Sequence, residues 1–140
     1  MPNIRIVIVD SHPHFRRALR RLLRTELGVE VVGEGENFGD AMKLVFELRP
    51  DVAIVDLSMP APKNFRAADF AALSKRWGCA VVAMSIWVDE EAETYAKSLG
   101  AVARIDKVYI HETLIPKIFA IIASKSKPKS NPRRADFAVS

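Results

Sequence analysis

Residues 50–60 read Pro50-Asp51-Val52-Ala53-Ile54-Val55-Asp56-Leu57-Ser58-Met59-Pro60, and this segment gives the clearest indication of the fold. Its four apolar residues, 52–55, run without a polar break, and Asp56 closes the run. So short an apolar run is typical of a strand buried on both faces of a sheet. Pro60 stops any continuation, because proline fixes its own φ and disfavours the helical conformation in the residue before it. The stretch predicts that Asp56 ends a buried strand, where open α/β sheets bind ligands.

Four more apolar runs and five helical patterns surround this strand. The runs predict strands at 4–9, 29–32, 79–84 and 101–105. Apolar residues at helical spacing predict helices at about 15–27, 38–48, 65–77 and 89–99, and a last helix with an unusually wide apolar face that ends near residue 124. Strict alternation of strands and helices predicts an α/β fold with three layers. We expect a doubly wound, five-stranded parallel sheet in the flavodoxin-like order 2-1-3-4-5.

Several single residues refine these helices. Gly28 and Gly100 are expected to end the first and fourth helices, and Asn37 is expected to cap the second. Pro116 falls inside the last helical pattern, so that helix is predicted to start late or to kink.

The positive charge of the chain is concentrated at one end. Residues 1–124 hold 16 basic and 16 acidic side chains, so the net charge of +4 lies in residues 125–140. We predict one domain over 1–124 and a basic flexible tail or linker over 125–140. The single Cys79 excludes an intramolecular disulfide, and no signal peptide or membrane-spanning segment is predicted. A cytoplasmic protein without membrane contact is therefore expected.

Polar residues end the other predicted strands as well. Asp10 follows the first strand, Ser85 the fourth and Lys107 the fifth. In the predicted order Asp10 and Asp56 end neighbouring strands at the same edge, where two carboxylates repel unless a cation or a proton lies between them. With oxygen ligands only, the ion that fits is Mg2+. His12 is interpreted as a surface or helix-cap histidine, because no second His or Cys lies near it.

These four residues together could carry phosphoryl transfer. Asp56 could attack phosphorus as a carboxylate nucleophile. Lys107 would neutralise charge on the transferred group, and the Ser85 hydroxyl would donate a hydrogen bond to it. Little else is required of a protein for this chemistry.

Four stretches carry a family resemblance: Ile8-Val9-Asp10-Ser11-His12-Pro13, residues 51–60, Val82-Ala83-Met84-Ser85 and Ile105-Asp106-Lys107. Over residues 3 to about 124 the chain resembles the CheY-like receiver domain of a bacterial two-component response regulator, most similar to the LuxR/FixJ-type receivers. The resemblance implies that Asp56 is the phosphoacceptor, with Ser85 as switch hydroxyl and Lys107 as phosphate contact. It implies a Mg2+ site made by Asp10, Asp56 and the Ser58 backbone carbonyl. The implied donor is a sensor histidine kinase, and self-dephosphorylation is the only enzymatic activity implied.

Departures from the family pattern leave a second interpretation open. Ser11 stands where the family has an acid, so it is at best a weak ligand and Mg2+ binding should weaken. Arg104 stands at the aromatic switch position, where its charge cannot be buried unpaired. Trp87 is expected to overhang the site. The alternative is a degenerate receiver that acts as a phosphorylation-independent protein-interaction module.

Other functions are less well supported. A stand-alone phosphatase of similar fold generally places a second Asp where this chain has Ser58. No helix-turn-helix follows residue 124, so DNA binding by this chain alone is not expected. The sequence leaves the kinase, the output partner and homodimer formation undetermined. The five arginines at 16–24 are interpreted as a solvated helix face or as one that meets an acidic partner.

Overall fold

All five predicted strands form one parallel sheet. The computed structural model describes residues 2–126. The strands are β1 (Ile4–Val9), β2 (Val29–Gly35), β3 (Val52–Asp56), β4 (Ala80–Ser85) and β5 (Ala101–Asp106). They are joined by α1 (Pro13–Arg24), α2 (Phe38–Leu48), α3 (Ala67–Arg76), α4 (Glu90–Ser98), the short 3-10 helix η1 (Lys107–Tyr109) and α5 (Ile110–Ser126). The sheet order is β2-β1-β3-β4-β5, which confirms the predicted fold class and topology.

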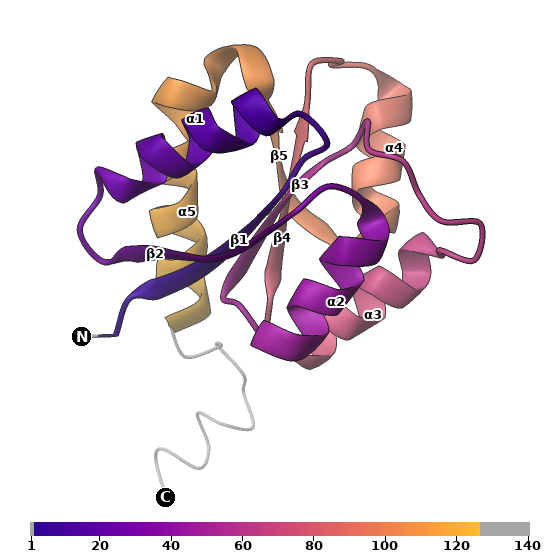
Figure 1. Ribbon diagram of the computed structural model, residues 1–140, viewed down its shortest axis with the longest axis horizontal. Helices are drawn as coiled ribbons and strands as arrows, with labels where there is room; N and C mark the ends of the chain where they lie inside the picture. The colour runs from indigo at the N-terminus through magenta and orange to yellow at the C-terminus, as the bar shows by residue number, and fades with distance from the viewer. Residues whose placement is uncertain (1, 127–140) are drawn as a thin grey trace, which may run out of the picture.

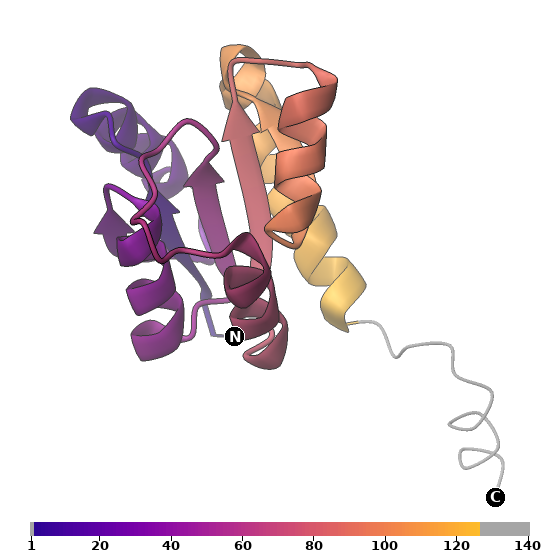
Figure 2. The same cartoon turned by 90° about the vertical axis from the view of Figure 1, so that its right-hand side faces the viewer.

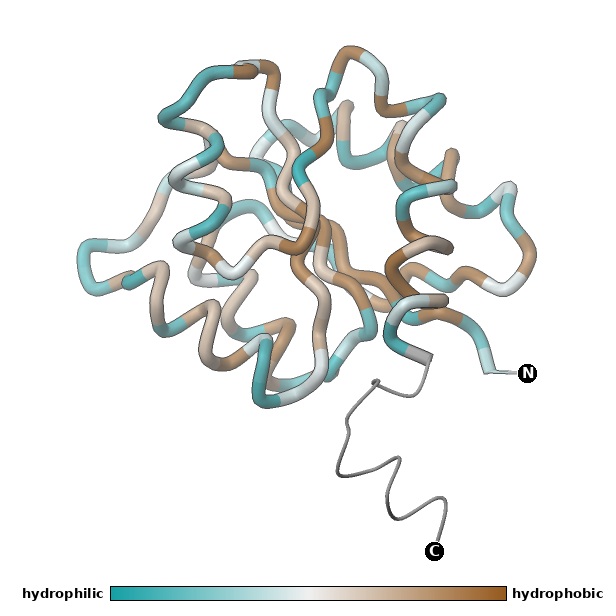
Figure 3. The backbone as a smooth tube through the Cα atoms, turned by 180° about the vertical axis from the view of Figure 1, so that it is seen from behind, coloured by the Kyte–Doolittle hydropathy of each residue, from teal (hydrophilic) through white to brown (hydrophobic). Residues whose placement is uncertain are grey.

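The helices cover the sheet in two layers (Figure 1). Successive residues of a strand point to opposite faces, so the two faces fill separate apolar clusters. Ile8 and Ile54 pack with α1 and α5, whereas Val9 and Val55 pack with α2 and α3. Figure 3 shows the resulting pattern, with the central strands hydrophobic and much of the helical periphery hydrophilic. Within residues 2–126, no helix is long and apolar enough to cross a membrane.

Figure 2 shows the strand arrows pointing toward one edge of the sheet, opposite the end where α5 finishes. That edge carries the loops that follow β1, β3 and β4. Leu57 N donates to Met84 O at 2.9 Å, and Asp10 N donates to Gly35 O at 3.0 Å. These bonds extend the strand pairing beyond the strand ends, so the first residues of the loops are held by the sheet.

The first helix ends earlier than predicted. α1 stops at Arg24, and the Thr25 hydroxyl donates to the carbonyl of Leu22. Leu27, which the apolar spacing placed in the helix, is 94% exposed, so its side chain does not hold the helix against the core. Gly28 has a φ of +85°, but it lies in the turn before β2 and does not end the helix.

The second strand is longer than predicted and runs through its glycines to Gly35. A Cβ on Gly35 would lie 2.6 Å from the Cβ of Asp40, which is closer than side chains approach. The glycine therefore lets the first turn of α2 pack directly on the strand. Asn37 caps this helix as predicted, because its side chain accepts a hydrogen bond from the backbone N–H of Asp40.

The last two helices partly follow their predictions. Gly100, with a φ of +78°, follows α4 as expected. α5 begins at Ile110, so the predicted late start is wrong, and Pro116 lies inside the helix. The wide apolar face of α5 is shared between the core and the surface, because Leu114 is buried and Phe119 is 40% exposed. Residues 125–126 belong to α5, and the rest of the predicted basic tail, 127–140, lies outside the described residues.

Cys79 is a buried residue directly before β4, and burial raises the pKa of its thiol to about 12. The thiol therefore stays protonated well above pH 9, while the unfolded chain ionises near its ordinary pKa of 9.0. We expect a disulfide reagent such as DTNB to leave the native protein unmodified at pH 8 and to modify it completely in guanidinium. Because the pKa is higher in the folded state, stability should also fall as pH rises from 9 toward 12. Rapid labelling of the native protein would contradict the buried position.

Candidate functional site

Two buried carboxylates lie side by side at the carboxyl edge of the sheet. β1 and β3 pair in parallel with Val9 opposite Val55. The residues that follow this pair, Asp10 just after β1 and Asp56 at the end of β3, therefore lie next to each other at the edge of the sheet. Asp10 is 0% exposed and Asp56 is 1% exposed. The predicted convergence of these two residues is therefore present in the structure.

Lys107 lies between the two carboxylates. Its Nζ is 2.7 Å from Asp10 Oδ2 and 3.3 Å from Asp56 Oδ1. The same ammonium lies 4.3 Å from the centre of the Phe15 ring, which gives it a cation–π contact as well. One positive charge balances two negative ones, so the site keeps a formal charge of −1. A buried carboxylate pair that still has excess negative charge favours binding of a further cation.

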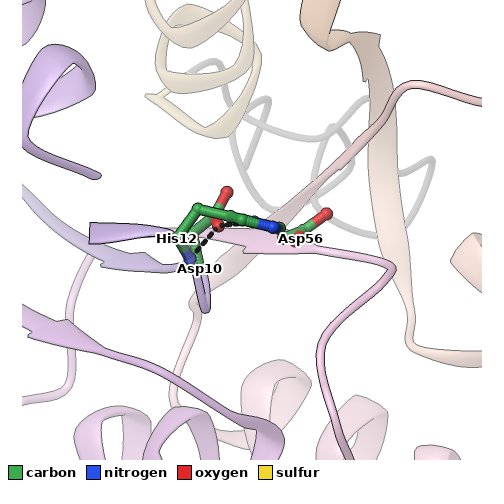
Figure 4. Close-up of side chains that lie close together, drawn as sticks. All are labelled: Asp10, His12 and Asp56. Atoms are coloured by element: carbon green, nitrogen blue, oxygen red, sulfur yellow. Dashed lines mark hydrogen bonds and ion pairs between the residues drawn. The ribbon is translucent and has the colours of Figure 1, made fainter. Parts of the chain in front are cut away.

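His12 also points into this cluster (Figure 4). Its backbone N–H donates to Asp10 Oδ1 at 2.8 Å, and its ring Nδ1 lies 3.1 Å from the same oxygen. Three possible ligand atoms, one each from Asp10, His12 and Asp56, lie within 4.8 Å of one another. The prediction of a surface or helix-cap histidine is confirmed, because His12 occupies the N-cap position of α1 and its side chain is 64% exposed. The sequence did not indicate that its ring nitrogen lies beside the two carboxylates.

Ser58 contacts Asp56 through its side chain. The Ser58 hydroxyl donates to Asp56 Oδ2 at 2.8 Å, and its backbone N–H lies 3.3 Å from Oδ1. Sequence reasoning named Ser58 only for its backbone carbonyl, and that role stays a prediction. A polar residue two positions after an aspartate is a common signal for such a local hydrogen bond and could have suggested the contact.

Ser85 is buried at the end of β4, as predicted, but its hydroxyl is used elsewhere. The Ser85 Oγ accepts a hydrogen bond from the Trp87 backbone N–H at 2.9 Å. Trp87 itself is exposed, and with Ser58, Ser85 and Tyr95 it lines a hollow of about 390 Å³. Trp87 does not line the hollow that Asp56 and Lys107 share, so the expected overhang of the phosphoacceptor stays a prediction. Ser85 thus lines the same hollow as Ser58, and among the residues that the structure describes its hydroxyl bonds to the Trp87 N–H and not to Asp56.

Arg104 forms an ion pair. Its Nε is 2.9 Å from Glu93 Oε2, which links β5 to α4. The Arg104 side chain is 20% exposed, so its charge is paired and partly solvated. This agrees with the expectation that an arginine here cannot be buried alone, and it places a charged link where the family has an aromatic ring.

Two of the arginines on α1 are also paired within the chain, since Arg16 and Arg20 contact Glu34 at the end of β2.

The donor set fits a divalent cation. A second hollow of about 570 Å³ lies at this edge. Its lining combines polar side chains, among them Asp56, Lys107 and His12, with apolar ones such as Phe15 and Ile86. Two neighbouring carboxylates, with net negative charge and open space beside them, suit an ion such as Mg2+ that also keeps water or phosphate ligands. Ser11 adds no charge to this set. The site therefore has one anionic ligand fewer than the usual family pattern, as the sequence predicts.

The model of the response regulator receiver domain family matches residues 6–119. The chain belongs to this family. It is 34% identical over 116 residues to the transcriptional regulatory protein DegU of Brevibacillus brevis, covering 82% of this chain and 48% of DegU. It is 35% identical over 104 residues to protein-glutamate methylesterase/protein-glutamine glutaminase 5 of Myxococcus xanthus, covering 74% of this chain and 30% of that protein. This receiver thus spans about half or less of the length of these two relatives.

Solved structures give the same assignment. The receiver superposes on the signal receiver domain of the response regulator NarL from Mycobacterium tuberculosis with a TM-score of 0.76 and 26% identity, covering 91% of this chain and 100% of that one. A LuxR-family response regulator from Aurantimonas sp. SI85-9A1 matches with a TM-score of 0.75 and 28% identity, covering 87% and 86% of the two chains. These neighbours confirm the resemblance to LuxR-type receivers.

Proposed function

We propose that this receiver accepts a phosphoryl group on Asp56 from a sensor histidine kinase. The observation that carries the proposal is the placement of the Asp56 carboxylate at the sheet edge, beside the Lys107 ammonium and the second carboxylate, Asp10. An Asp56 oxygen attacks phosphorus and forms the new O–P bond. The bond from phosphorus to the imidazole nitrogen of the donor breaks, and its electron pair leaves with that nitrogen.

The surrounding residues hold the transferred group. Lys107 offsets negative charge on the phosphoryl oxygens, and the Ser58 hydroxyl is free to turn from Asp56 toward them. Asp10 and Asp56 would hold a Mg2+ ion, with the Ser58 carbonyl as a further ligand and Ser11 as a weak one. When bound, the ion supplies positive charge to the phosphoryl oxygens. We propose no enzymatic activity for this receiver other than loss of its own phosphoryl group.

Ser85 and the contact between α4 and β5 carry the switch in this proposal. The Ser85 hydroxyl would exchange the Trp87 N–H for a phosphoryl oxygen, and the loop between β4 and α4 would follow it. The Arg104–Glu93 pair connects that movement to the exposed side of α4. The output is then a changed helical surface in the cytoplasm for a protein partner or a second copy of the chain. DegU is named a transcriptional regulatory protein, but the segment matched here covers only 48% of it.

Phosphoryl labelling tests this proposal and separates it from the degenerate alternative, which Ser11 and Arg104 favour. We expect acetyl phosphate with Mg2+ to label the wild type weakly, in a form that hydroxylamine removes. Ser11→Asp should raise the labelling rate about tenfold or more, because it restores an anionic ligand. The same change at the exposed Ser124 on α5, Ser124→Asp, is the matched control and should leave the rate unchanged. If neither wild type nor Ser11→Asp is labelled, the chain is an interaction module.

A further inference from the structure

We propose that His12 is a metal ligand and that its site takes a first-row transition ion, such as Mn2+ or Co2+, in preference to Mg2+. The inference deepens the proposed function, because it concerns the cation at the same carboxylate edge. It starts from the group formed by Asp10, His12 and Asp56, whose ligand atoms lie within 4.8 Å of one another. This group contains one nitrogen donor and two carboxylates, which is a different donor set from the all-oxygen site implied by the resemblance.

The geometry places the imidazole nitrogen beside the position that an ion shared with the carboxylates would occupy. The backbone N–H of His12 bonds to Asp10 Oδ1, and this bond fixes the residue at the start of α1. The ring Nδ1 then lies 3.1 Å from the same oxygen, so both atoms can bind one cation. The His12 side chain is 64% exposed. Without an ion, a proton on Nδ1 would be donated to Asp10 Oδ1, and when an ion binds, the neutral imidazole can carry its proton on Nε2 and present the Nδ1 lone pair to the ion.

The charges of the site weaken its attraction for any divalent cation, so the nitrogen donor has a larger share in deciding which ion binds. Lys107 balances one of the two carboxylates, and Ser11 supplies no negative charge. Mg2+ binds mainly through charged and neutral oxygen ligands and gains little from an imidazole. Transition ions bind nitrogen well, and their affinity for mixed nitrogen and oxygen sites rises from Mn2+ through Co2+. This chain has Ser11 where the family has an acid, and His12 follows it. The site therefore loses an anionic oxygen ligand and gains a nitrogen ligand, which shifts its binding preference from Mg2+ toward these ions.

Direct binding measurements without any phosphoryl donor test the inference. In calorimetric titrations of the full chain with CoCl2, MnCl2 and MgCl2, we expect Co2+ to bind most tightly and Mg2+ most weakly. His12→Ala should weaken Co2+ binding about tenfold or more, while Mg2+ binding changes about twofold or less. His111→Ala is the matched control, because His111 is an exposed histidine on α5 outside the ligand group and outside the hollow that Asp56 and Lys107 line, and it should bind both ions as the wild type does.

A spectroscopic readout on the wild type makes the test independent of any variant's folding. Proton NMR of the Co2+-loaded protein should show contact-shifted imidazole signals that are absent in His12→Ala and kept in His111→Ala. The inference fails if those signals are missing from the wild type, if His12→Ala binds Co2+ normally, or if Mg2+ binds as tightly as Co2+. Any of these results would leave the role of Asp56 untouched, since that role is measured by phosphoryl labelling.

Discussion

Replacing Asp56 by asparagine is expected to abolish phosphoryl incorporation. An amide has no anionic oxygen with which to attack phosphorus, so no acyl phosphate can form at this position. Asparagine keeps the shape of the side chain and its Oδ1 acceptor for the Ser58 N–H, so the local structure should be retained. The measurement is labelling from acetyl phosphate or from a purified sensor kinase, with the label followed through hydroxylamine treatment.

The asparagine variant should also remain folded. It removes one of two adjacent buried negative charges, and Lys107 keeps its 2.7 Å ion pair with Asp10. We therefore expect no loss of thermal stability relative to the wild type. Asp69→Asn, the same chemical change at an exposed residue in the first turn of α3, is the matched control and should be labelled normally. Labelling of Asp56→Asn at the wild-type rate would place the phosphoryl group on another residue.

The sequence predicts the strands and the position of Asp56 well because both follow from local patterns. Uninterrupted apolar runs specify doubly covered strands, and parallel pairing brings the ends of β1 and β3 to one edge without further information. A polar residue directly after such a run must therefore lie at that edge. This reasoning placed four residues together: Asp10, Asp56, Ser85 and Lys107. The structure confirms the convergence of Asp10, Asp56 and Lys107, whereas the Ser85 hydroxyl bonds to the Trp87 N–H.

The details that the sequence did not reveal depend on side-chain directions. The link between Arg104 and Glu93 joins residues 11 apart on different elements, and no local pattern pairs them. The orientation of the His12 ring toward Asp10 depends on a rotamer at the start of α1. The hydrogen bond of Ser85 to the Trp87 N–H depends on the path of the loop after β4. Each of these contacts is set by packing or loop geometry, which apolar periodicity does not report.

Removing the charge of Lys107 is expected to cause the largest loss of stability at the site. Lys107→Met keeps the approximate length of the side chain and can keep packing on the Phe15 ring, but it leaves two neighbouring buried carboxylates without a cation between them. Breaking a buried ion pair in this way costs about 3–5 kcal/mol in the free energy of unfolding. Urea unfolding in the presence of a chelator should show this loss. Lys43→Met, at an exposed position on α2, should change the free energy by about 0.5 kcal/mol or less.

Two further measurements assign the loss in Lys107→Met to charge repulsion and not to altered packing. A divalent cation that binds the folded state should restore stability, by about 2.7 kcal/mol at a concentration 100-fold above its dissociation constant. Adding Asp10→Asn to the variant should restore stability as well, without metal, because only one buried carboxylate then remains. If the unfolding free energy of Lys107→Met differs little from wild type and responds to neither change, Lys107 does not stabilise the Asp10–Asp56 pair. If the cation restores stability but Asp10→Asn does not, repulsion between the two carboxylates is not the cause of the loss.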